Sequence, residues 1–166
     1  AVLPPIMAKA VLCWGLFIYT VTIPFMVWRL ATREVKPAAF HTQAIVLAPC
    51  SLCLVSYLNV VKEPSQIVVV ILTVCVMASL AFIVIKLPAF YAVPFAPGFA
   101  GLTFPMAIGI VASNKAAAFF TGAGQETLGY VVKQIAGVQI YLTTAIIGMV
   151  LFGFLKMLFG TGKKAG

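Results

Sequence analysis

The sequence predicts an all-α integral membrane protein with five transmembrane helices. Of its 166 residues, 63% are hydrophobic and only 8% are charged, whereas a soluble domain carries about 25% charged residues. Five uncharged stretches are each long enough for a spanning helix of about 20 residues, and they cover residues 10–28, 42–61, 67–85, 87–114 and 134–155. We expect one membrane domain over residues 1–166, with helices near 7–30, 40–61, 66–86, 98–114 and 125–158.

Prolines and charges set the expected helix boundaries. Pro88, Pro94 and Pro97 favour a connector, because the residue before a proline avoids the helical conformation. The fourth helix is therefore expected to begin near Gly98 and the fifth near Gln125. The segment 115–133 is expected outside the membrane. The third helix is large and apolar on nearly every face, which suits a position facing lipid.

The chain is strongly basic, with eleven Lys and Arg against three Glu and a formal charge of +8. The basic residues form no stripe, which argues against a nucleic-acid partner and favours lipid head groups and an anionic solute. Five spans place the ends on opposite sides. One side carries Lys9, Lys62, Lys115 and Lys133, and the other carries Arg29, Arg33, Lys36, Lys86, Lys156, Lys163 and Lys164. Basic loops face the cytoplasm, so we expect a cytoplasmic C-terminus in the cell (inner or plasma) membrane.

Acidic residues are missing from all five predicted spans. The chain has no Asp, and Glu34, Glu63 and Glu126 all lie between spans. Proton relays and cation sites in membranes use carboxylates or His, so this pattern favours passage of anions over transport of cations. We assign no chemical catalysis.

Cys50 and Cys53 form a C-x-x-C pair, a spacing found in zinc and redox sites. Structural zinc needs four ligands, whereas Cys13 and Cys75 lie on other helices and His41 at a helix end. The pair is therefore interpreted as two packing residues, and no metal or cofactor is expected.

The second and fourth helices carry a weak internal repeat. "AIVLAPCSLCLVS" around Pro49 aligns with "GLTFPMAIGIVA" around Pro105. Small or polar residues follow at helical spacing on both helices: Thr42, Pro49, Cys53 and Ser56 on one, and Gly98, Gly101, Pro105, Gly109 and Ala112 on the other. Two interpretations stay open for these faces, close helix packing or the wall of a pore beside a bent helix.

Phe104 stands directly before Pro105, where we expect the fourth helix to bend. A Phe in an apolar helix is usually a core residue. In a pathway lined by small residues, one bulky ring beside a bend can instead act as a hydrophobic gate.

The motifs "IVLAPCSLCLVSYL" (45–58) and "GLTFPMAIGIVAS" (101–113) resemble the tellurite-resistance and dicarboxylate transporter family, which is TehA-like and includes the plant slow anion channels. The resemblance implies ten helices in five hairpins around a central pore, of which this chain is the C-terminal half and lacks the first five. It implies that the second and fourth helices are inner and that the other three are outer. It also implies a homotrimer and a gate at Phe104.

The resemblance predicts a channel or transporter for small inorganic or organic anions. The first alternative is a gradient-coupled transporter of C4-dicarboxylates, or an efflux protein for tellurite or drugs. The second is a structural membrane subunit, whose small-residue faces would be protein contacts.

Overall fold

The computed structural model describes residues 4–32, 43–92 and 94–160, and within them the chain is helical with no β-strand. The five α-helices are α1 (Pro5–Thr32), α2 (Leu47–Val60), α3 (Gln66–Tyr91), α4 (Thr103–Gly122) and α5 (Glu126–Gly160), and a 3₁₀ helix, η2 (Pro97–Leu102), precedes α4. With the 3₁₀ turns before α2 and α4 included, all five are long and apolar enough to cross a membrane. Within the described residues, the predicted all-α class and the five helices that are long and apolar enough to span a membrane are confirmed.

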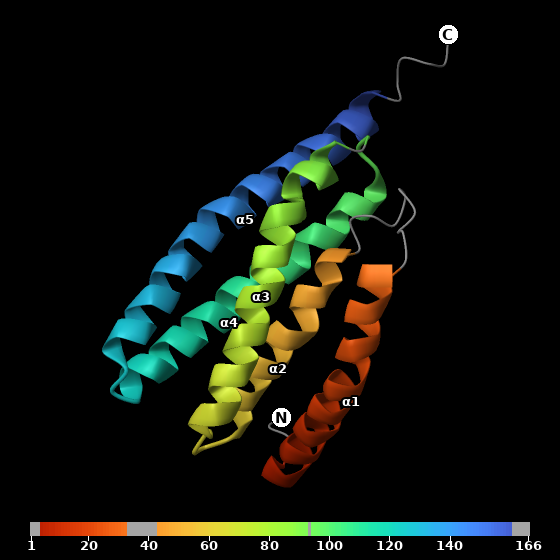
Figure 1. Ribbon diagram of the computed structural model, residues 1–166. Coiled ribbons are helices and arrows are strands. Elements are labelled where there is room, and N and C mark those ends of the chain that lie inside the picture. Colours follow the sequence, from red (N-terminus) through yellow and green to blue (C-terminus); the bar gives the residue numbers. More distant parts are fainter. Residues whose placement is uncertain (1–3, 33–42, 93, 161–166) are drawn as a thin grey trace.

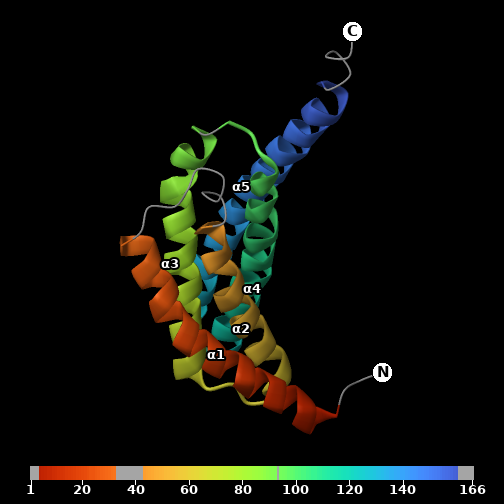
Figure 2. The same ribbon diagram turned by 90° about the vertical axis from the view of Figure 1, so that its right-hand side faces the viewer.

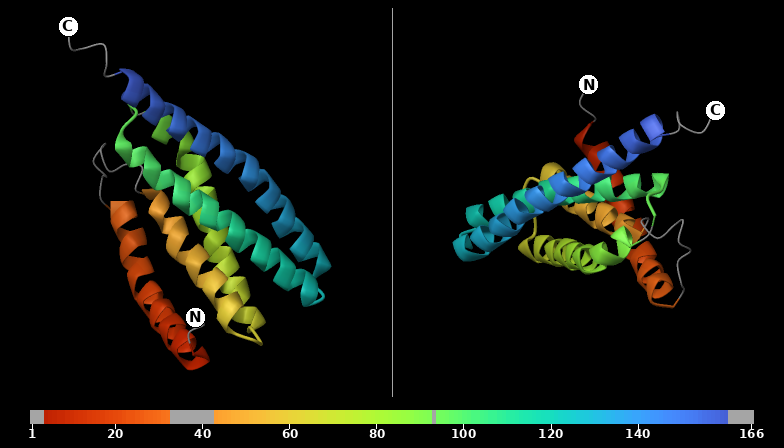
Figure 3. Two further views of the ribbon diagram at one scale, coloured as in Figure 1. Left: turned by 180° about the vertical axis from the view of Figure 1, so that it is seen from behind. Right: turned by 90° about the horizontal axis from the view of Figure 1, so that it is seen from above.

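Four helices lie side by side in the order α1, α2, α4, α5, and α3 lies across one face of α2 and α4 (Figures 1 and 3). Figure 2 shows α3 beside α2, and α3 also contacts α4. The start of α1 and the end of α5 are at opposite ends of the bundle (Figure 1). This arrangement agrees with the expected placement of the two chain ends.

The two central helices are α2 and α4. In each, 44% of the most apolar spanning window is buried, compared with 17% in α5 and 6% in α1. Leu47 and Leu54 of α2 and Met106 and Phe120 of α4 belong to the buried core. Helix α3 has the highest mean hydropathy of the five, 3.1, and exposes large aliphatic residues such as Ile67, Ile71 and Ile85. Its outward face therefore suits lipid, as the sequence predicts.

Two helices run further than the sequence predicts. Helix α3 continues through Pro88 to Tyr91, and the backbone N–H of Ala92 still donates to the carbonyl of Pro88. Helix α4 passes Lys115 and ends only at Gly122, because residues 116–118 are all alanine, the strongest helix former. Most of the segment 115–133 is thus helical.

The internal repeat is visible in the backbone. Helix α2 begins at Leu47 and α4 at Thr103, an offset of 56 residues, and each follows a 3₁₀ turn (43–46 and 97–102). Pro49 and Pro105 are both the third residue of their helix. The first four N–H groups of a helix have no partner within it, so a proline there removes no helical hydrogen bond. Pro105 therefore lies at the junction of η2 and α4 rather than at a bend within a helix.

A tight turn joins α4 to α5. Gly124 has φ 80°, a conformation that favours glycine. The N–H of Gln125 donates to the carbonyl of Phe120, and the N–H of Gly124 donates to that of Thr121. These two bonds form a Schellman motif, which satisfies the last carbonyls of a helix. The turn leads α5 back along α4, with Gly129 against Ala117 and Thr121.

An aromatic cluster anchors η2 to α5. The ring of Phe95 stacks on Phe99 at 5.0 Å and meets Phe154 edge-on at 5.3 Å between centroids. It also lies against the backbone of Gly153, where a Cβ atom would collide with the ring. These contacts fix the position of η2 and hence the start of α4.

Candidate functional site

The small-residue face of α4 is a packing face. Gly109 and Ala112 are buried. A Cβ atom on Gly109 would lie 2.5 Å from Nε2 of Gln139 on α5 and 3.2 Å from Cδ2 of Leu47 on α2. Close approach of this kind is the usual role of small residues in membrane helices. Within this five-helix arrangement, Gly109 and Ala112 line no open surface.

A different face of α4 is open. Its residues recur at helical spacing and are all exposed: Phe104, Ala107, Val111, Asn114 and Ala118. We call this set the open stripe. Gly109 and Ala112, on the opposite face of α4, are buried, so the open stripe faces away from the packed side of this helix. Phe104 is 57% exposed, whereas the adjacent Pro105 is buried.

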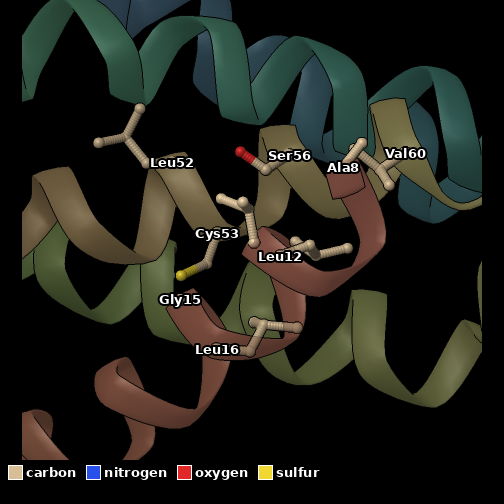
Figure 4. Close-up of a pocket in the computed structure, with 9 residues that line it drawn as sticks. Ala8, Leu12, Gly15, Leu16, Leu52, Cys53, Ser56 and Val60 are labelled. Atoms are coloured by element: carbon tan, nitrogen blue, oxygen red, sulfur yellow. The ribbon is translucent and has the colours of Figure 1, made fainter. Parts of the chain in front are cut away.

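The predicted site residues of α2 lie mainly in a separate groove. Cys53 and Ser56 are half-buried and line a groove of about 390 Å³ between α1 and α2, with Leu12 and Leu16 on its other wall (Figure 4). Pro49 is half-buried at the start of α2, and Gly101 is half-buried in η2. The groove residues are not part of the open stripe. Thr42 lies outside the described residues.

The two cysteines of the C-x-x-C pair have different surroundings. The Cys50 thiol is buried, donates to the carbonyl of Leu47 at 3.1 Å and lies 3.6 Å from Oγ of Ser79 on α3. Cys53 instead lines the groove beside α1. All four cysteines are free thiols, and the described residues contain no group of three His, Cys, Asp or Glu side chains suited to a metal. His41 lies outside those residues.

The structure contains a buried polar contact between α4 and α5 that the sequence did not predict. Ser113 Oγ donates to Oε1 of Gln139 at 3.1 Å, and both side chains are buried. The Gln139 Nε2 has no partner among the described residues. Buried polar groups are nearly always hydrogen-bonded. A Ser and a Gln within long apolar stretches would have indicated that two helices form a polar contact there.

One cation lies on α4 beside the open stripe. Lys115 is the only charged residue of Thr103–Gly122 and is half-buried. Its Nζ donates to Oδ1 of Asn59, in the last turn of α2, at 2.7 Å. The two residues are 56 positions apart, so they occupy equivalent places in the repeat. No carboxylate of the described residues pairs with Lys115.

No family model, curated protein or solved structure matches the chain. Its function is therefore inferred from its residues and their geometry.

Proposed function

We propose that the chain is half of a membrane channel or transporter that passes small anions, and that the open stripe of α4 forms part of the pathway wall. The observation that carries this proposal is the exposure of Phe104 on a central helix whose other faces are packed. A bulky ring that projects from a packed helix into an uncovered space is suited to act as a hydrophobic gate.

The composition of the open stripe supports a pathway wall rather than a lipid contact. Besides Phe104 and Val111, it consists of two alanines and Asn114. The exposed face of α3 is instead lined with Ile and Val. The most apolar window of the η2–α4 span also has a mean hydropathy of 1.3, against 3.1 for α3. A face of small and polar residues gains little from contact with acyl chains and leaves room for a solute.

The charge pattern supports an anion as the solute. Each end of the bundle carries basic residues, for example Lys62 at one end and Lys86 and Lys156 at the other. Of the described acidic residues, Glu63 precedes α3 and Glu126 is the first residue of α5, at the end of its span. Fixed positive charge at both mouths raises the local concentration of anions, while the lack of a carboxylate in the middle of the described spans disfavours cations.

The remaining parts of the proposal rest on the resemblance to the TehA-like family. Five further helices, on the same chain or in a second copy, would cover the open stripe and complete a ring around a central pore. The assembly would be a homotrimer in the cell membrane, with lipids around it and the C-terminus in the cytoplasm. It would need no cofactor and perform no chemical reaction.

The test uses Phe104→Ala in the complete natural protein, reconstituted into liposomes. Removal of the ring should raise the rate of anion flux several-fold. The matched control is Phe17→Ala, because Phe17 is 59% exposed but lies on the outer helix α1; its flux should stay at the wild-type level. Equal flux from Phe104→Ala and wild type, at equal amounts of reconstituted protein, would count against the gate.

Two measurements separate the alternatives. A gradient-coupled carrier would show saturable flux that scales with an imposed pH gradient, whereas a channel would not.

A structural subunit would bury the open stripe against protein. In a variant with the native cysteines replaced, Ala107→Cys should react with water-soluble thiol reagents and Ala112→Cys should not. Protection of both positions would favour the structural subunit.

A further inference from the structure

We infer that Lys115, oriented by Asn59, is the binding site for a small inorganic anion at one end of the open stripe. This inference rests on the proposed function and names the residue that recognises the solute. Lys115 follows Phe104 by 11 residues, which is close to three helical turns, so the two side chains leave nearly the same side of α4. Along the helix axis their Cα atoms are about 16 Å apart at 1.5 Å per residue.

Asn59 orients Lys115 without neutralising it. The hydrogen bond from Nζ to Oδ1 is 2.7 Å long and uses one of the three donors of an ammonium group. The partner is an uncharged amide, so the positive charge of Lys115 is retained in full. A purely structural link at this position would be better served by a carboxylate. Because the Asn59 amide carries no charge, the ammonium group of Lys115 stays available to an anionic ligand.

The position of the pair suits an entry site. Asn59 belongs to the last turn of α2 and is exposed, while the stem of Lys115 is half-buried against the bundle. The neighbouring Asn114 is exposed as well and uses one of its N–H groups on the carbonyl of Ile110. Its second N–H has no hydrogen-bond partner within the described residues and lies on the same exposed end of α4. A hydrated anion that reaches this end therefore meets one fixed positive charge, held in place by Asn59, on the side of α4 that carries Phe104.

Chemically the site fits a small hydrated anion such as chloride or nitrate. An ammonium is a compact point charge without the planar fork that selects carboxylates. A single cation with neutral neighbours binds weakly enough to release its ligand, which conduction requires. A lipid phosphate could contact the same group, so the binding test is made in micelles of a non-ionic detergent without phospholipid.

The binding test measures the melting temperature of the complete protein while sodium nitrate replaces sodium gluconate at constant ionic strength. Ligand binding to the folded state raises this temperature. Wild type and Lys115→Arg should be stabilised by nitrate. Lys115→Gln, which removes the charge, and Asn59→Asp, which neutralises it with a carboxylate, should lose that response. Lys133→Gln is the matched control, because Lys133 is an exposed lysine on α5; it should respond like wild type.

Asn59→Asp separates anion binding from a structural role. The variant keeps the α2–α4 link as an ion pair, so a structural role predicts unchanged or higher stability and no other effect. Anion binding predicts that the nitrate response disappears and that conductance at low nitrate falls several-fold in a Phe104→Ala background. A nitrate response that persists in both Lys115→Gln and Asn59→Asp would overturn the inference. That result would leave the proposed function intact if Phe104→Ala still opened the pathway.

Discussion

Gly129 marks the closest approach of α5 to α4. A Cβ atom on this residue would collide with Oγ1 of Thr121 and lie 3.0 Å from the carbonyl oxygen of Ala117. Because backbone atoms cannot swing aside, we expect Gly129→Ala to destabilise the protein by about 1–3 kcal/mol, the usual cost of overpacking. The melting temperature in detergent micelles measures the loss.

The control for this prediction is on the same helix. A Cβ atom on Gly137 would have no neighbouring atom within 4 Å, so Gly137→Ala should leave the melting temperature unchanged or raise it slightly, since Ala is the better helix former. Equal melting temperatures for Gly129→Ala and Gly137→Ala would show that the close contact at Gly129 is not present.

The pair Ser113 and Gln139 gives a second prediction at this scale. Ser113→Ala removes the donor to Oε1 of Gln139 and leaves a buried amide with no partner, which should cost about 1–3 kcal/mol. Adding Gln139→Leu replaces that amide with an apolar group of similar size. The double variant should therefore recover most of the stability. A thermodynamic cycle in which the two changes simply add would contradict the contact.

At the scale of the helix, the position of Pro105 leads to a prediction. As the third residue of α4 it removes no helical hydrogen bond, so Pro105→Ala should change the unfolding free energy by no more than about 1 kcal/mol. Ile110→Pro, in the middle of α4, should cost about 3 kcal/mol or more because it breaks the ladder and clashes with the preceding turn. Similar losses from the two changes would place Pro105 inside the helix instead.

The helices themselves were predictable because their signal is local. Uncharged runs of about 20 residues set the number of spans, and the repeat around Pro49 and Pro105 identified the two helices that lie at the centre. The ends were less predictable. Pro88 is typical of a helix stop, yet α3 continues to Tyr91. Lys115 is typical of the end of a span, yet its Nζ finds a neutral partner in Asn59 and α4 continues past it.

The candidate functional face was harder to predict, since it depends on which neighbours cover each side of α4. A stripe of glycine and alanine is compatible with both an open wall and a packed seam. The close approach of Leu47 and Gln139 to Gly109 shows that this residue lies in a packed contact between helices. The same packing turns Phe104 outward. The sequence pointed to Phe104 for its place beside Pro105, and the three-dimensional neighbours explain why the ring is uncovered.

For the whole molecule, the testable property is its orientation. The loop after α2 and the end of α5 lie at opposite ends of the bundle (Figure 1). We expect Glu63→Cys, in a variant without the native cysteines, to react with a membrane-impermeant thiol reagent on intact cells. Gly160→Cys should react only after permeabilisation, because basic loops face the cytoplasm. Labelling of Gly160→Cys on intact cells would reverse the assigned orientation.

Helix α5 has 35 residues, so its length can be compared with the thickness of a bilayer. Lys133 and Lys156 are both exposed and lie about 35 Å apart along the axis at 1.5 Å per residue, slightly more than a typical hydrocarbon core of about 30 Å. Their ammonium groups can stay at the two head-group layers if α5 tilts. Because α4 is tied to α5 through Gly129 and Ser113 and to α2 through Lys115, a change in the tilt of α5 would be transmitted through α4 to α2.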